Sequence, residues 1–199
     1  TLRHRGPDDQ GIWCDESRGV VLGHRRLSII DLSRQGHQPM TSHDGRFIVT
    51  LNGEIYNHQD LRKELVSHGY HFKGTSDTEV AACAIQQWGI PAALRKFTGM
   101  FAFGIWDRYR GSLCLARDRM GEKPLYYGSF NNTFAFASEL KALRAHPDWS
   151  VEIDRDALAQ MLRYSYVPTP RSIYSGIYKL PPATYIEVGA DRAKKEIIP

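Results

Sequence analysis

One segment, FIVTLNGEIYN at residues 47–57, combines a core strand with a cluster of polar groups. Residues 47–51 are mostly apolar, which is typical of a strand covered on both faces. The amide of Asn52, the backbone of Gly53 and the carboxylate of Glu54 follow directly. Two N–H donors, one from Asn52 and one from Gly53, would stabilise the charge on a carbonyl oxygen during amide hydrolysis. An Asn-Gly pair is also a strong hairpin-turn signal, which the segment alone favours.

Further motifs surround this segment in a fixed order. They are RHRGPD (3–8), GHRRLSIID (23–31), GTSDTE (74–79), GMFAF (99–103), ARDRMGEKPLYYG (116–128) and SELKAL (138–143). Over about residues 2–182, the series resembles the glutaminase domain of glutamine-hydrolysing asparagine synthetases. Other class II glutamine amidotransferases share the fold but match the arginine and Asn-Gly segments less well.

The spacing of apolar residues predicts the elements of the fold. Strands are expected at 11–14, 20–24, 27–32, 47–52, 100–106, 113–117, 124–128 and 133–137. Helices are expected at 59–67, 76–88, 91–96, 138–144 and 157–164, with Asn57 and Asp154 as caps and a capping box formed by Ser76 and Glu79. This predicts an α+β fold with two sheets facing each other and helices outside. The resemblance implies the four-layer αββα sandwich of N-terminal nucleophile hydrolases, with two antiparallel sheets packed face to face.

Composition limits the classes of protein that the chain can represent. Its 199 residues suit one domain. We assign residues 1–188 to the amidotransferase domain, lacking its N-terminal strand and nucleophile, and 189–199 to the start of a linker. The 26 Lys and Arg residues are scattered among 22 acids, so no nucleic-acid partner is expected despite the net charge of +4.

No membrane partner is expected either, because no apolar run is long enough for a span and no signal pattern opens the chain. This predicts a cytoplasmic protein. Cys14, Cys83 and Cys114 are expected to be reduced core thiols. The eight histidines show no metal-ligand spacing, so no metal is expected in this domain.

Glutamine carries a carboxylate, an ammonium and a neutral amide, and its site must hold all three. The guanidinium of Arg26 can bind a carboxylate through two parallel hydrogen bonds. The resemblance assigns this role to Arg26 and implies that the pocket wall is formed by Leu27, Ser28, Ile29 and Ile30.

The resemblance also matches Asp77 to the acid that pairs with the substrate ammonium, assisted by Glu54. Asp77 has a structural alternative, because a carboxylate in the first turn of a helix is stabilised by the helix dipole. A surface or structural role likewise stays open for Arg26, and the side chain of Glu54 could point to solvent.

The nucleophile implied by the resemblance is an N-terminal cysteine whose own α-amine acts as the base. An α-amine titrates near pH 8, so it can accept the thiol proton at neutral pH. This sequence starts with Thr1, one residue before the segment Leu2 to Asp8, which follows the nucleophile's strand and a helix in the family. We therefore expect Thr1 not to be catalytic and the fragment to be inactive.

Three functions remain open from the sequence, with a basic nucleic-acid binder as a distant fourth. The leading hypothesis is a fragment of an asparagine synthetase that hydrolyses glutamine to glutamate and ammonia for the ATP-dependent amidation of aspartate. The alternatives are amidation of another carboxylate, such as a sugar acid, and a non-catalytic binding module. The expected partners are glutamine and a C-terminal synthetase domain, and the sequence leaves a homodimer open. No cofactor is expected in this domain, because the Ser-Gly-Gly-x-Asp-Ser loop for ATP is absent; ATP and Mg²⁺ are implied for the synthetase domain.

Overall fold

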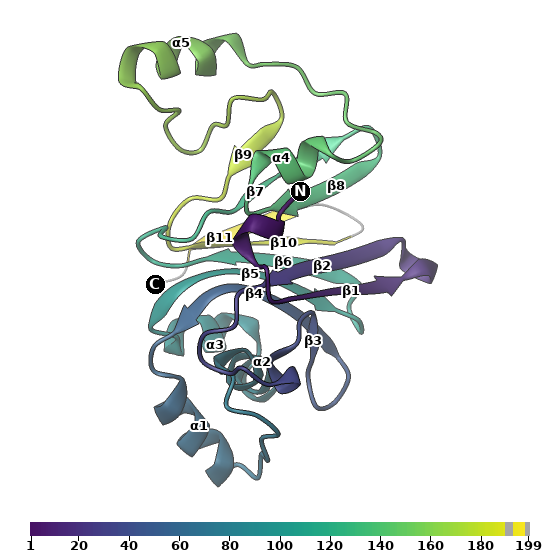
Figure 1. Cartoon of the computed structure of the whole chain (residues 1–199), viewed down its shortest axis with the longest axis vertical. Coiled ribbons are helices and arrows are strands. Elements are labelled where there is room, and N and C mark those ends of the chain that lie inside the picture. The colour runs from purple at the N-terminus through teal and green to yellow at the C-terminus, as the bar shows by residue number, and fades with distance from the viewer. Residues whose placement is uncertain (190–192, 198–199) are drawn as a thin grey trace.

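A six-stranded antiparallel sheet forms the centre of the molecule, in a computed structural model that describes residues 1–189 and 193–197. Its strands, in spatial order, are β11 (Ala193–Ile197), β10 (Thr184–Val188), β6 (Ser112–Arg117), β5 (Gly99–Asp107), β4 (Phe47–Ile55) and β3 (Met40–Thr41). One face of this sheet is covered by helices α1 (His58–Ser67), α2 (Asp77–Trp88) and α3 (Ile90–Lys96), as Figure 1 shows.

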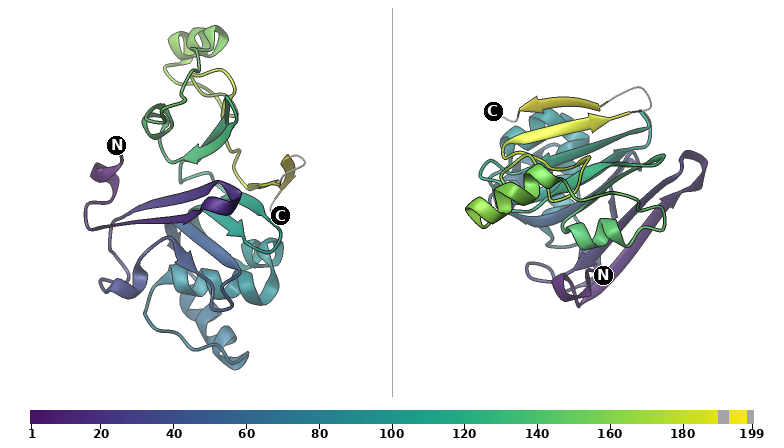
Figure 2. Two further views of the ribbon diagram at one scale, coloured as in Figure 1. Left: turned by 90° about the vertical axis from the view of Figure 1, so that its right-hand side faces the viewer. Right: turned by 90° about the horizontal axis from the view of Figure 1, so that it is seen from above.

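Two smaller sheets cover the opposite face (Figure 2). One is the hairpin of β1 (Asp9–Asp15) and β2 (Val20–Arg26); the other has the order β8 (Thr133–Ala137), β7 (Tyr126–Phe130), β9 (Ile177–Lys179). Helices α4 (Leu140–Arg144) and α5 (Arg155–Tyr164) lie beyond them, and short 3₁₀ turns occur at η1 (Arg3–Arg5), η2 (Glu16–Arg18) and η3 (Arg34–Gly36). The layers confirm the predicted αββα architecture.

Apolar side chains fill the spaces between the layers. On the helix side, Phe97, Phe101 and Phe103 are fully buried and their rings contact one another. On the other side, the ring of Phe136 on β8 lies over Gly104 of β5, where an added Cβ would come within 2.4 Å of it. The two sheets are therefore in direct side-chain contact, which explains why the central strands are apolar at nearly every position.

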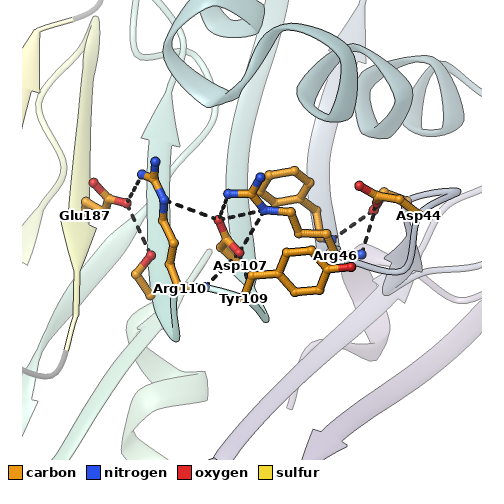
Figure 3. Close-up of polar contacts among 9 residues, drawn as sticks. Asp44, Arg46, Asp107, Tyr109, Arg110 and Glu187 are labelled. Atoms are coloured by element: carbon orange, nitrogen blue, oxygen red, sulfur yellow. Dashed lines mark hydrogen bonds and ion pairs between the residues drawn. The ribbon is translucent and has the colours of Figure 1, made fainter.

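A buried carboxylate organises one end of the β4–β5 pair (Figure 3). Nε of Arg46 lies 3.1 Å from each carboxylate oxygen of Asp107, and Nη2 lies 2.6 Å from Oδ2. Oδ1 of Asp107 also accepts the backbone N–H groups of Tyr109 and Arg110, at 2.9 and 3.1 Å. The carboxylate thus joins the start of β4 to the turn after β5.

The strand predicted at 27–32 is wrong, because β2 ends at Arg26 and the next residues are irregular. Side chains bind the backbone groups that a sheet would have paired. The Asp8 carboxylate accepts the N–H of Ser28 at 2.8 Å, and the Arg26 guanidinium donates to the carbonyls of Asp31 and Ser33. An apolar run does not form a strand when its backbone is already satisfied in this way.

The predicted cap at Asn57 is wrong, and the predicted capping box at the start of α2 is confirmed only for Ser76. The side chain of Asn57 donates to the carbonyl of Lys96 and accepts the N–H of Thr98, so it ties α1 to the end of α3 and makes no cap bond. Ser76 does cap α2, but Glu79 accepts the N–H groups of residues 73 and 74 and thus orders the preceding turn. The cap at Asp154 is confirmed, because its side chain accepts the backbone N–H groups of Asp156 and Ala157.

The expectations for the cysteines and for the linker are met only in part. Cys83 and Cys114 are buried as predicted, whereas Cys14 is exposed, because it lies on the outward face of β1 with Ile12. Part of the expected linker forms β11, residues 190–192 and 198–199 lie outside the described residues, and the boundary at 188 stays a prediction. Within residues 1–189 and 193–197, every helix is too short or too polar to cross a bilayer.

Candidate active site

Asn52 and Gly53 lie inside β4, where they pair with Ala102 and Phe101 of β5. The hairpin-turn interpretation of this dipeptide is therefore wrong. Gly53 has φ of +148°, and a Cβ at this position would lie 2.0 Å from the carbonyl oxygen of Met100. Glycine is required because no other residue allows β5 to approach so closely at that angle.

A cavity of about 990 Å³ opens above this part of β4. It lies between the hairpin, β8 and the central sheet, and its lining includes Thr50, Asn52, Arg25 and Ser138. Nδ2 of Asn52 donates a hydrogen bond to Oγ of Ser138 at 3.2 Å. An amide nitrogen has two hydrogens, so a second donor of Asn52 remains for a molecule in the cavity.

The carboxylate of Asp77 lies at the N-terminus of α2 and is almost completely buried. Its Oδ2 accepts the backbone N–H of Ile55 at 3.0 Å. Burial raises the pKa of Asp77; the hydrogen bond from Ile55 lowers it less, and the nearby charge of Glu54 raises it further. The structure thus brings the start of α2 to the strand segment that carries Asn52, Gly53 and Glu54, with one Asp77 oxygen already engaged.

Arg26 is buried at the end of β2, and its guanidinium is held by backbone carbonyls. Nη1 lies 2.9 Å from the oxygen of Ser33, and Nη2 contacts the oxygen of Asp31. Two of the five guanidinium donors are used in this way, which leaves three for another ligand. The predicted pocket wall is open to solvent at Leu27 and Ile29, with 55% and 68% exposure. The carboxylate-binding role of Arg26 stays a prediction.

The described cysteines do not contribute a thiol to the cavity, because none of them is among its lining residues. Burial raises the pKa of Cys83 to about 12, which keeps this thiol protonated and a poor nucleophile at neutral pH. Among the residues that the structure describes, no three His, Cys, Asp or Glu side chains are arranged to hold a metal ion.

Two buried side chains that sequence reasoning did not single out support the site. The Asp31 carboxylate accepts the backbone N–H groups of Ser33 and Thr75, each at 2.8 Å. The Ser33 side chain, followed by these two backbone bonds, lowers the pKa of Asp31 to about 2. The other is Gln38, whose amide bonds to Leu51. Asp31 stands within a quoted motif, which was the available signal, whereas no local pattern marks Gln38.

Relatives of this chain were found by comparison with known proteins. It is 39% identical over 194 residues to asparagine synthetase [glutamine-hydrolyzing] 3 of Bacillus subtilis (strain 168), covering 96% of this chain and 31% of that protein. For asparagine synthetase [glutamine-hydrolyzing] 1 of the same organism, the identity is 42% over 188 residues, with 94% and 29% covered. The chain thus spans about three tenths of the length of these relatives.

Solved structures show the same fold. Glutamine phosphoribosylpyrophosphate amidotransferase from B. subtilis, complexed with ADP and GMP, matches with a TM-score of 0.63 and 21% identity, covering 90% of this chain and 35% of that one. A structure described as the allosteric regulatory enzyme of purine biosynthesis matches with a TM-score of 0.66, 21% identity and the same coverage. The glutamine amidotransferase domain family matches residues 1–197. The chain belongs to this family and has its N-terminal nucleophile hydrolase fold.

Proposed function

We propose that this chain is the glutaminase part of a glutamine-hydrolysing asparagine synthetase. In this function, the domain converts glutamine to glutamate and ammonia, and the ammonia is used in the ATP-dependent amidation of aspartate. The observation that supports it best is the placement of Asn52 at a cavity while the buried carboxylate of Asp77 is held beside the same strand segment. The identity to relatives named as such synthetases supports it further.

Each proposed role follows from the chemistry of the group. Attack on the glutamine amide places negative charge on its carbonyl oxygen, and we assign the Asn52 amide and the Gly53 N–H as the donors that stabilise this charge. The Asp77 carboxylate, with Glu54 nearby, would bind the substrate ammonium. The unused donors of Arg26, beside the backbone of 27–30, would bind the substrate carboxylate.

We assign the attacking thiol to a cysteine other than Cys14, Cys83 and Cys114, because the described cavity lining contains none of these. ATP and Mg²⁺ are assigned to a synthetase domain, as the resemblance carried by the sequence motifs implies. Glutamine and that domain are therefore the proposed partners.

Substitutions in the full-length protein test these roles. Asn52→Ala removes a donor that acts mainly in the transition state, so kcat for glutamine hydrolysis should fall by about 10²-fold or more. Arg26→Ala and Asp77→Asn should act mainly by raising KM, because both groups hold glutamine far from the bond that breaks. Release of ammonia from glutamine is the measurement, and equal kcat values for Asn52→Ala and the parent would refute the oxyanion role.

A further inference from the structure

The side chain of Gln38 makes three hydrogen bonds in a buried position. Its Oε1 accepts the N–H of Leu51 at 2.7 Å, and its Nε2 donates to the carbonyl of Leu51 at 3.3 Å. The same Nε2 lies 3.2 Å from Oγ1 of Thr78 in the first turn of α2. One amide therefore binds both backbone groups of the residue before Asn52, as a neighbouring strand would.

The two hydrogen bonds from Gln38 to Leu51 take the place of strand pairing beyond the end of β3. β3 pairs with β4 only at Met40–Val49 and Thr41–Ile48, so it does not reach Leu51. Without Gln38, the N–H and C=O of Leu51 would be buried without partners, at a cost of about 1–3 kcal/mol for each unsatisfied group.

Gln38 and Asp77 hold β4 on either side of the proposed oxyanion donors. Backbone N–H groups alternate between the two edges of a strand, so those of Leu51, Gly53 and Ile55 point to the same edge. The first is bound by Gln38 and the third by the Asp77 carboxylate at 3.0 Å. The N–H of Gly53 lies between these two fixed points, and both are connected to the first turn of α2.

We propose that Gln38 is a positioning residue for glutamine hydrolysis. It sets the orientation of the peptide between Leu51 and Asn52, and thereby aims the Asn52 amide and the Gly53 N–H at the reacting carbonyl. This inference rests on the proposed function, because it takes Asn52 and Gly53 as oxyanion donors. Gln38 itself touches no reacting atom.

Gln38→Leu in the full-length protein tests the proposal, with Ser42→Ala as the matched control. Ser42 is also buried, and its hydroxyl accepts the N–H of Phe47 at 2.9 Å at the other end of the same strand. Misplacement of an oxyanion donor should lower kcat of Gln38→Leu by roughly 10- to 100-fold. Its KM should change by less than about threefold, because no proposed substrate contact is removed. Ser42→Ala should lose thermal stability but keep the parent kcat.

A conservative variant adds a pH readout that a loss of stability does not produce. In Gln38→Glu, an ionised carboxylate still accepts the N–H of Leu51 but donates to neither the carbonyl nor Thr78. A protonated carboxyl group restores one donor. The ratio of the Gln38→Glu kcat to the parent kcat should therefore rise as the pH falls.

Hydrogen exchange provides a measurement that does not depend on activity. Peptides that cover residues 51–55 should exchange faster in Gln38→Leu than in Ser42→Ala or the parent. Unchanged exchange there would overturn the proposal. An active parent whose Gln38→Leu variant has the same kcat would overturn it as well, whereas a full-length parent that releases no ammonia from glutamine would overturn the proposed function.

Discussion

Replacing Asp107 by Asn should destabilise the domain by about 2 kcal/mol. The Asp107 side chain is 3% exposed and that of Arg46 is 30% exposed. Breaking a fully buried ion pair by removing one partner costs about 3–5 kcal/mol. We expect less than this range, because water reaches Arg46 and because the Asn carbonyl can still accept the N–H groups of Tyr109 and Arg110. For a domain of this size, a loss of about 2 kcal/mol lowers Tm by roughly 4–8 °C.

Urea unfolding followed by tryptophan fluorescence would measure this loss, since Trp106 is buried directly beside Asp107 in β5. Arg110→Ala is the control. Its side chain is 68% exposed and lies 4.0 Å from Asp107 and 3.8 Å from Glu187. Loss of such a surface contact should cost no more than about 0.5 kcal/mol. A cost below this value for Asp107→Asn, or equal costs for the two variants, would refute the reasoning.

The pH dependence checks the electrostatic origin of this effect. Burial raises the pKa of Asp107, but the hydrogen bonds and charge of Arg46 outweigh it, so the pKa is lowered overall. A carboxylate with a lowered folded-state pKa stabilises the protein above its unfolded value of about 3.9, and this stability is lost as the pH falls through the folded value. The difference between the parent and Asp107→Asn should therefore shrink in acid.

Two further predictions concern the candidate site. Burial raises the pKa of Asp77, so ionisation of this carboxyl group opposes folding. The stability of Asp77→Asn relative to the parent should therefore increase as the pH rises above 3.8. Urea unfolding measures this difference in stability, and a difference that is constant with pH would contradict the prediction. The 199-residue chain alone should release no ammonia from glutamine, since no described cysteine lines the cavity. Ammonia release that Thr1→Ala abolishes would show instead that Thr1 is a nucleophile.

The sequence predicted those elements whose pattern is local and complete. The strand at 133–137 and the helix cap at Asp154 agree with the structure, because alternation and capping depend on neighbours in the chain. The signal at Asn52-Gly53 was equally local but misleading. Asn52 pairs with Ala102, about fifty residues away along the chain, and this strand pairing overrides the turn preference.

The residue types of the candidate site were predictable from the sequence, but the hydrogen bonds that join them were not. Asp77 stood out as a first-turn carboxylate, yet its bond to Ile55 depends on how α2 meets β4. Gln38 carried no signal at all, because an amide that pairs with a backbone can be recognised only once the strand edge it covers is known. Long-range hydrogen bonds are therefore the part of this site that the sequence does not reveal.

The position of Gly53 within a paired strand has a consequence for how such a protein changes over evolution. Donors carried by a loop can be redirected by an insertion or a deletion, but here either change would shift the register of β4 against β5 and turn its buried side chains to the opposite face. The proposed oxyanion donor is thus protected from gradual change. The irregular residues 27–30 lie outside the sheet, so their sequence can change without altering this register.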